Sequence, residues 1–245
     1  MARLALFLLL LLAPLRVAGA AEPLVADLTS HLIGITTGFT GTNMVLFGAT
    51  DGPGDIVVSV RGPERDLVVR RKSRVAGVWM NTSQATFPNT PSFYGLATSR
   101  PLEQIAPPSV RALHQFGLDN MRIGLKEKLP PEDAAEFRTA LIRTQQREGL
   151  FTREAGKVNF LGDRLFRTNI AFPSNVPTGT YLVEVYLLRD GNVVSGQTIP
   201  LDISQVGVGA EVYEFATQQA LLYGIIAVVA AAMAGWLASL PFRRV

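Results

Sequence analysis

The feature that most constrains the fold of this chain is a run of 21 residues without a charged side chain, at positions 220–240. As an α-helix the run would be about 31 Å long, which matches a bilayer core of about 30 Å. Tyr223 and Trp236 stand toward its two ends, where amphipathic rings favour the membrane interface. We therefore expect a transmembrane helix over residues 219–240.

A second apolar run occupies residues 4–15 and leads into the small-residue sequence Ala18-Gly19-Ala20. This pattern predicts a cleaved signal peptide over residues 1–20, with Ala21 as the first mature residue. The alternative is an uncleaved anchor, but a helix of this length would be only about 18 Å long, which is too short to cross a bilayer.

The charges that flank the predicted membrane helix set its orientation. Glu211 and Glu214 precede it, whereas Arg243 and Arg244 follow it. Because basic residues are retained on the cytoplasmic side, we expect a cytoplasmic tail over residues 241–245. Residues 21–206 would then form a domain on the other side of the membrane, joined to the helix by residues 207–218.

The composition of this exported part excludes several classes of function. Without the predicted signal peptide and tail it has 19 basic and 20 acidic residues, so the basic character of the whole chain comes from its ends and gives no support for nucleic acid as a partner. The chain has no cysteine, which excludes disulfides, thiol catalysis and thiolate metal sites.

The exported part is predicted to be mainly β, because short apolar runs alternate with turn residues. The clearest signal is residues 181–203, in which Asp190-Gly191 separates two strands and predicts a type I′ hairpin. Its entry, Pro177-Thr178-Gly179-Thr180-Tyr181, resembles the penultimate strand of immunoglobulin-like sandwiches. We therefore expect an immunoglobulin-like β-sandwich, whose other strands would lie at 31–35, 44–48, 55–60, 66–71, 75–80, 93–97 and 165–172.

The spacing of apolar residues changes from that of strands to that of helices between residues 103 and 149, where we expect a helical insertion. Residues 108–116 and 132–148 are predicted helices. Pro130-Pro131 stands at the start of the second helix, acidic residues occupy its first turn and basic residues its last turn, which suits the helix dipole.

Taken whole, the chain resembles an uncharacterised alphaproteobacterial family, the putative transmembrane protein family of that class. The resemblance is carried by residues 41–49, 68–72, 77–81, 91–94 and 99–102, and by the terminal sequence Phe242-Arg243-Arg244. It implies a bacterial inner-membrane protein, and it offers no catalytic residues to carry over. The exported domain expected from the two apolar runs would then be periplasmic.

Candidate catalytic, cofactor and metal sites are absent from the sequence pattern. His31 and His114 are the only histidines, and neither has metal-ligand spacing to the other. The segment 51–55 has too few alternating carboxylates for a calcium loop and is predicted to be a plain turn. We therefore expect no enzyme activity, no cofactor and no metal.

Two features indicate binding. The first is the densest basic cluster of the chain, which precedes Trp79 and lies near an aromatic pair. The alternative interpretation is a solvent-exposed edge strand whose charges prevent aggregation. The second is a row of small residues along the membrane helix, which would let another helix approach closely. The candidate contacts for a partner or ligand are Arg70, Arg71, Lys72, Arg74, Trp79, Phe93 and Tyr94, and those for helix packing are Ala227, Ala231, Gly235 and Ser239.

Two hypotheses for the function follow. The first is an accessory or assembly protein of the inner membrane, which binds another membrane protein such as a transporter. The second is a periplasmic domain that binds an anion or a small ligand, or acts on it, in a pocket between the sandwich and the helical segment 103–149, near residues 70–74. The second predicts a concave pocket near Trp79, Phe93 and Tyr94 with converging polar groups.

Overall fold

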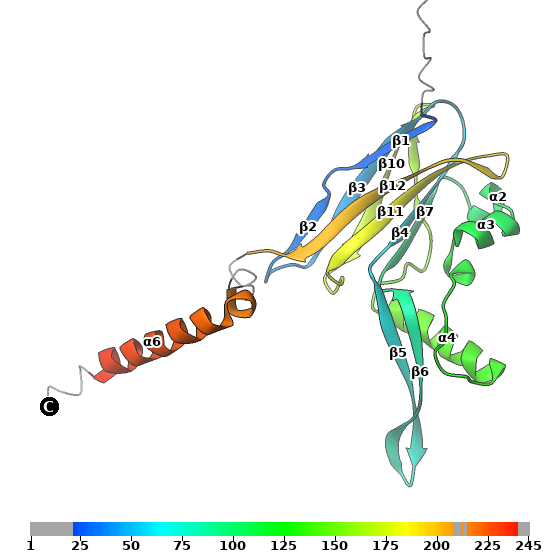
Figure 1. The fold of residues 1–245 in the computed structure, drawn as a ribbon. Coiled ribbons are helices and arrows are strands. Elements are labelled where there is room, and N and C mark those ends of the chain that lie inside the picture. Colours follow the sequence, from blue (N-terminus) through cyan, green and yellow to red (C-terminus); the bar gives the residue numbers. More distant parts are fainter. Residues whose placement is uncertain (1–21, 208–211, 213–214, 240–245) are drawn as a thin grey trace, which may run out of the picture.

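The computed structural model of the protein describes residues 22–207, 212 and 215–239. Two β-sheets pack face to face, a long hairpin and several helices lie at their side and lower end, and one apolar helix stands apart from them (Figure 1). The predicted signal peptide (1–20) and cytoplasmic tail (241–245) lie outside the described residues, as do residues 208–211 and 213–214 of the predicted joint.

The first sheet has four antiparallel strands in the order β1-β3-β10-β9. The alternation that defines a half-buried strand is clearest in β10, where Phe166, Thr168, Ile170 and Phe172 are buried and the residues between them are exposed. The four strands are β1 (Leu24–Leu28), β3 (Gly41–Thr50), β9 (Asn159–Leu161) and β10 (Leu165–Pro173).

The second sheet has six strands in the order β2-β12-β11-β4-β7-β8. Its pairs are antiparallel except at the two edges, where β2 runs parallel to β12 and β8 runs parallel to β7. The strands are β2 (Leu32–Ile35), β4 (Asp55–Arg61), β7 (Tyr94–Thr98), β8 (Gly156–Lys157), β11 (Gly179–Arg189) and β12 (Asn192–Gln205).

One hydrophobic core fills the space between the two sheets. Leu46 of β3 and Phe166 of β10 are buried in the same cluster as Val58 of β4 and Val185 of β11. Burying side chains of this size against one another is the main term that holds two sheet faces together. The described β residues therefore form a sandwich.

Strand β4 is buried on both of its faces from Ile56 to Val60, and all of these residues except Ser59 are apolar, as in a strand covered on both sides. Its outer face at Val57 is covered by Ile105 and Phe116, which come from the helical segment. The short helices of this segment are α2 (Leu102–Ile105), α3 (Pro108–His114) and the 3₁₀ turn η1 (Leu118–Asn120).

A long hairpin, β5 (Glu64–Val75) and β6 (Val78–Pro91), forms a separate two-stranded ribbon that projects from the sandwich (Figure 1). Helix α4 (Pro131–Arg147) packs across its base, where Phe137 and Leu141 contact Ala85 and Phe87. The base is thus held by a small core of its own, while the outer part of the ribbon extends beyond α4.

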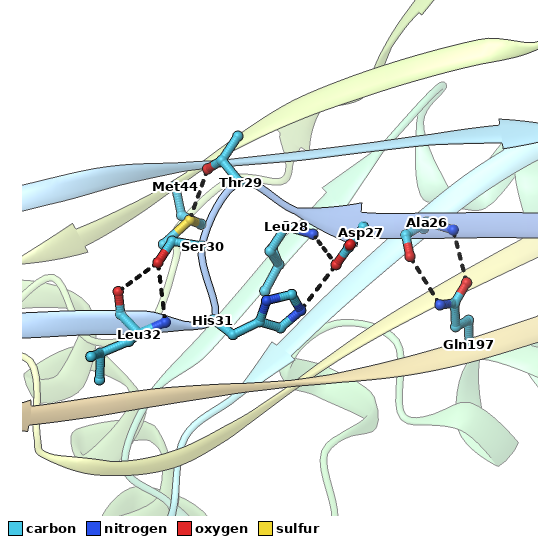
Figure 2. Close-up of polar contacts among 9 residues, drawn as sticks. All are labelled: Ala26, Asp27, Leu28, Thr29, Ser30, His31, Leu32, Met44 and Gln197. Carbon is cyan, nitrogen blue, oxygen red and sulfur yellow. Dashed lines mark hydrogen bonds and ion pairs between the residues drawn. The ribbon is translucent and has the colours of Figure 1, made fainter.

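The chain passes from the first sheet to the second between β1 and β2, as Figure 2 shows. The side chain of Ser30 bonds both the N–H and the carbonyl of Leu32, and His31 lies 3.0 Å from the Asp27 carboxylate. Beside this crossing, the Gln197 side chain of β12 bonds the backbone of Ala26 in β1. This amide links the two sheets along one open edge of the sandwich.

Several sequence predictions are confirmed. The Asp190-Gly191 turn joins β11 to β12 with the positive φ angles of +49° and +78° that a type I′ turn requires. The second predicted helix is α4, with Pro131 at its first position, and the first is α3. The segment 51–54 connects β3 to β4 without strand structure, as predicted for a turn.

The prediction of one strand over residues 75–80 is wrong at its centre, because β5 ends at Val75 and β6 begins at Val78. Ala76 and Gly77, with φ angles of +49° and +86°, form the tight turn between β5 and β6. Ala-Gly is a weak turn signal because alanine adopts positive φ only at a cost, whereas Asn-Gly and Asp-Gly are the usual type I′ pairs. Strands β1, β8 and β9 were not predicted, and they have only five, two and three residues. Residues 81–91 of β6 were also missed, because the predicted strand stopped at residue 80.

Candidate interaction surfaces

The basic cluster of β5 is divided between the two faces of the hairpin. Arg71 points toward α4, where its guanidinium lies 3.1 Å from Asp133, 2.7 Å from Glu136 and 4.7 Å from the centre of the Phe137 ring. Its charge is therefore paired, and its role is to fasten the hairpin to the first turns of α4.

The other three basic residues, Arg70, Lys72 and Arg74, are exposed. In the part of the chain that the structure describes, no carboxylate lies within ion-pair distance of any of them. The alternation of a strand keeps them on the side of β5 away from α4, as the sequence predicted. They remain available to an anionic partner.

Beyond Arg71 the ribbon ends in what we call the hairpin tip, residues 72–82. Trp79 is opposite Arg74 across the two strands and is 68% exposed. Val75, Val78 and Met80 are 48%, 62% and 52% exposed. The tip therefore combines exposed apolar side chains with unpaired positive charge.

Phe93 and Tyr94 do not belong to this surface, which corrects the expected proximity of the aromatic pair to the basic cluster. Both are about 1% exposed. The Phe93 ring stacks on Phe172 at 5.2 Å and lies 5.7 Å from Tyr181, inside the sandwich core. The alternating pattern of a short strand did not show that both faces of β7 are covered.

Tyr94 instead joins the helical segment to the six-stranded sheet. Its hydroxyl accepts a hydrogen bond from the N–H of Gly117 at 2.8 Å and donates one to the carbonyl of Gln115 at 3.2 Å. Burial raises the pKa of Tyr94 above its ordinary value, so the phenol stays protonated and keeps both bonds.

A cavity of about 490 Å³ lies where the base of the hairpin meets the six-stranded sheet. Arg61 and Arg122 line it, and Arg61 is held by Glu184 at 3.5 Å and by the carbonyl of His114 at 3.0 Å. Tyr94 forms part of its wall. Neither the hairpin tip nor Phe93 lines it, so the pocket lies apart from the predicted basic cluster.

The outer face of the four-stranded sheet carries an apolar patch that the sequence analysis missed. Its members are cross-strand neighbours. Val25 and Leu165 are both paired with Ala49, and Leu161 is paired with Leu165. Val25, Phe47, Leu161 and Leu165 are each between 47% and 55% exposed, and they line a shallow depression of about 390 Å³. We call Val25, Phe47, Ala49, Leu161 and Leu165 the apolar patch.

One sequence signal could have found the apolar patch. Residues 44–47 of β3 are an unbroken apolar run, although this strand has only one face in the core. A half-buried strand in contact with water on its outer side alternates apolar and polar residues instead. A strand that is apolar on both faces indicates that its outer face has a partner.

Helix α6 (Ala220–Ser239) has 20 residues and no charged side chain, so it is long and apolar enough to cross a membrane. None of its candidate span is buried against the domain. Ala227, Ala231 and Gly235 recur at every fourth position, and a methyl group added at Gly235 would meet no atom within 4 Å. Ser239 is the last residue of α6, and its side chain lies outside the described residues.

Among the described residues, no group of three or more histidine, aspartate or glutamate side chains could hold a metal ion. His31 pairs with Asp27 on the surface, and His114 stacks on Phe116 at 5.4 Å and against Tyr186 at 5.2 Å. Both histidines thus have structural neighbours.

Comparison with models of protein families identifies the family of this chain. Residues 23–244 match the model of a family described as "Putative transmembrane protein", so the match covers the domain and the apolar helix together. The chain therefore belongs to this family. A search of curated proteins gave no match.

Proposed function

We propose that this member of the family is a membrane-anchored accessory or assembly protein with no reaction of its own. Its β domain would lie in the periplasm and α6 in the bacterial inner membrane, with the C-terminus in the cytoplasm. The domain would bind another inner-membrane protein, for which a transporter is one candidate. The orientation rests on the charges that flank the apolar helix.

The observation that carries the proposal is the apolar patch. An exposed row of large apolar side chains across four strands is unusual for a face in contact with water, and such a patch is typical of an interface between proteins. The neighbouring Asp27 and Arg167, which also line the depression, would supply the polar rim of such an interface.

We also infer that the domain is an immunoglobulin-like sandwich. The orders β1-β3-β10-β9 and β2-β12-β11-β4-β7 support this, as does an N-terminal segment that is divided between the two sheets. The hydroxyl of Tyr181, near the start of β11, donates to the carbonyl of Pro177 at 2.6 Å, in the manner of a tyrosine corner. Sandwiches of this kind bind partners through their sheet faces and loops.

Photo-crosslinking in the native membrane tests the proposal. A photoreactive phenylalanine analogue placed at Phe47 should give one major crosslinked protein. The matched control is the same analogue at Val194, which is about as exposed but lies on β12 of the other sheet, and it should not give that product. Equal crosslinking at the two sites would contradict the proposal.

The small-residue face of α6 adds a second contact within the membrane, because small residues let helices approach closely. Gly235→Leu should weaken the association with the partner. Ala230→Leu adds similar bulk on a different face of the helix and is the control. If both variants keep the partner equally well, only the β domain makes the contact.

A second candidate function is suggested by the cavity at the base of the hairpin. Arg61 and Arg122 would attract a small anion, although Glu184 already neutralises part of that charge. The Arg122→Ala variant should then lose any thermal stabilisation that small periplasmic anions give the unchanged protein. The absence of such stabilisation in the unchanged protein would remove this candidate.

A further inference from the structure

The hairpin and the chain that leads to α6 leave the sandwich at the same end. In the six-stranded sheet, Arg61 at the end of β4 pairs with Leu182 near the start of β11, and Ile203 near the end of β12 pairs with Gly179. Arg65, at the base of the hairpin, bonds the carbonyl of Thr178 next to this position. Figure 1 shows the hairpin and α6 extending from this end of the sheets.

The hairpin is long enough to reach the membrane that α6 would cross. Strand β5 has 12 residues, which as extended chain span about 40 Å. Hydrogen bonds from Gln219 to Phe215 and from Tyr223 to Gln219 continue the helix back to residue 215. Residues 206–214 can therefore separate the sheet from the helix by at most about 30 Å.

The charge of the hairpin suits an anionic surface. Residues 67–91 contain no aspartate or glutamate, and they include Arg70, Arg71, Lys72 and Arg74. The acidic partners Asp133 and Glu136 from α4 are used by Arg71. The remaining three cations lie toward the tip, where each would attract anionic lipid headgroups.

The apolar side chains of the tip suit the interfacial region of a bilayer. Tryptophan is enriched in this region because its ring is apolar and its N–H is polar, and Trp79 is such a residue at the tip. Val75, Val78 and Met80 surround the turn and are uncovered within the described part of the chain. An isolated two-stranded ribbon is marginal in water, so contact with a membrane would also stabilise it.

From this combination of position, reach, charge and apolar surface, we propose that the hairpin tip binds the surface of the same bilayer that α6 crosses. Val75, Val78, Trp79 and Met80 enter the interfacial region. Lys72 and Arg74 of the tip bind anionic headgroups together with Arg70, which precedes the tip on the same face of β5. With α6 this gives the domain two points of attachment, which fixes its orientation above the membrane. The apolar patch lies toward the opposite end of the sheets, so this inference rests on the membrane placement of α6 in the proposed function but not on the partner proposed for that patch.

Tryptophan fluorescence of the full-length protein in vesicles tests the proposal. The Trp236→Phe variant leaves Trp79 as the only tryptophan, since the chain has two. In vesicles of phosphatidylglycerol and phosphatidylcholine in equal parts, its emission should shift to shorter wavelength, and lipids that carry a quencher near the headgroup should quench it. In phosphatidylcholine alone the quenching should be several-fold weaker, and high salt should weaken it further.

Charge variants in the Trp236→Phe background complete the test. Changing Arg70, Lys72 and Arg74 to glutamine should abolish the quenching in anionic vesicles. The matched control changes Arg153, Lys157 and Arg164 to glutamine, which removes the same charge from exposed positions elsewhere in the domain and should leave the quenching intact. A Trp79 that emits as in water and is not quenched in anionic vesicles would overturn the proposal and would indicate a protein partner for the tip.

Discussion

Gln197 of β12 occupies the place of a strand neighbour for Ala26 of β1. Its side-chain oxygen accepts the Ala26 N–H at 2.8 Å, and its side-chain nitrogen donates to the Ala26 carbonyl at 2.9 Å (Figure 2). Because β1 is the edge of the four-stranded sheet, these backbone groups would otherwise have no strand partner. One amide side chain thus closes the edge and joins the two sheets.

Removal of this amide should destabilise the sandwich. Gln197→Leu leaves two partly buried backbone groups without partners, and we expect a loss of about 1–3 kcal/mol in the free energy of unfolding. The same change at the exposed Gln205 of β12 is the control and should have little effect. Chemical denaturation measures both, and equal stability of the two variants would show that the Gln197 bonds contribute nothing.

Arg71 should matter for the position of the hairpin more than for global stability. Its ion pairs with Asp133 and Glu136 are partly exposed, so Arg71→Ala should cost at most about 1 kcal/mol. Hydrogen exchange should nevertheless speed up locally in β5, β6 and α4. Arg70→Ala changes the opposite face of the same strand and is the control. Unchanged exchange in the Arg71 variant would mean that the apolar contacts of Phe137 alone hold the ribbon.

Gly48 allows two elements to approach β3 closely. A Cβ atom at this position would lie 2.5 Å from Cζ of Phe166 and 2.5 Å from the carbonyl oxygen of Val25. Gly48→Ala should therefore push both β1 and the Phe166 ring away from β3, and it should lower the free energy of unfolding by about 1–3 kcal/mol. At Gly124 a Cβ atom would meet nothing within 4 Å, so Gly124→Ala serves as the control in thermal denaturation. A Gly48 variant as stable as the control would contradict the packing.

Asp55 should make stability depend on acidic pH. Hydrogen bonds from Arg100 at 2.8 Å and Ser99 at 2.9 Å hold the pKa of this carboxyl below its ordinary value of 3.8. A lowered folded pKa means that the stabilisation is complete above the unfolded pKa and is lost as the pH falls through the folded pKa. The melting temperature should therefore fall less on acidification in Asp55→Asn than in the unchanged protein. An identical fall in both would contradict this role of Asp55.

Local sequence signals predicted many of the turns and helix starts, because the backbone preferences of a few neighbouring residues decide these elements. Asp190-Gly191 and Pro130-Pro131 specify a turn and a helix start through the φ angles that these residues favour. The Ala76-Gly77 turn was missed because its alanine adopts a positive φ that its own preferences do not favour. At this turn the backbone conformation is decided by the pairing of β5, with twelve residues, and β6, with fourteen.

The candidate surfaces were predictable only in part, because they depend on contacts between distant segments. The periodicity of β5 placed Arg70, Lys72 and Arg74 on one face, but it did not show that Arg71 meets α4 more than sixty residues later. Likewise, the apolar patch forms only when β1, β3, β9 and β10 align. Phe93 was placed on the surface because its partner Phe172 is 79 positions away in the sequence.

The most direct test of the central claim is affinity purification of the full-length protein from its native membrane in mild detergent, with mass spectrometry of the bound proteins. The account predicts one stoichiometric membrane protein that is lost in Leu165→Lys, in the apolar patch, and retained in Val194→Lys. A protein that purifies without any partner, or a partner that binds both variants equally, would contradict it.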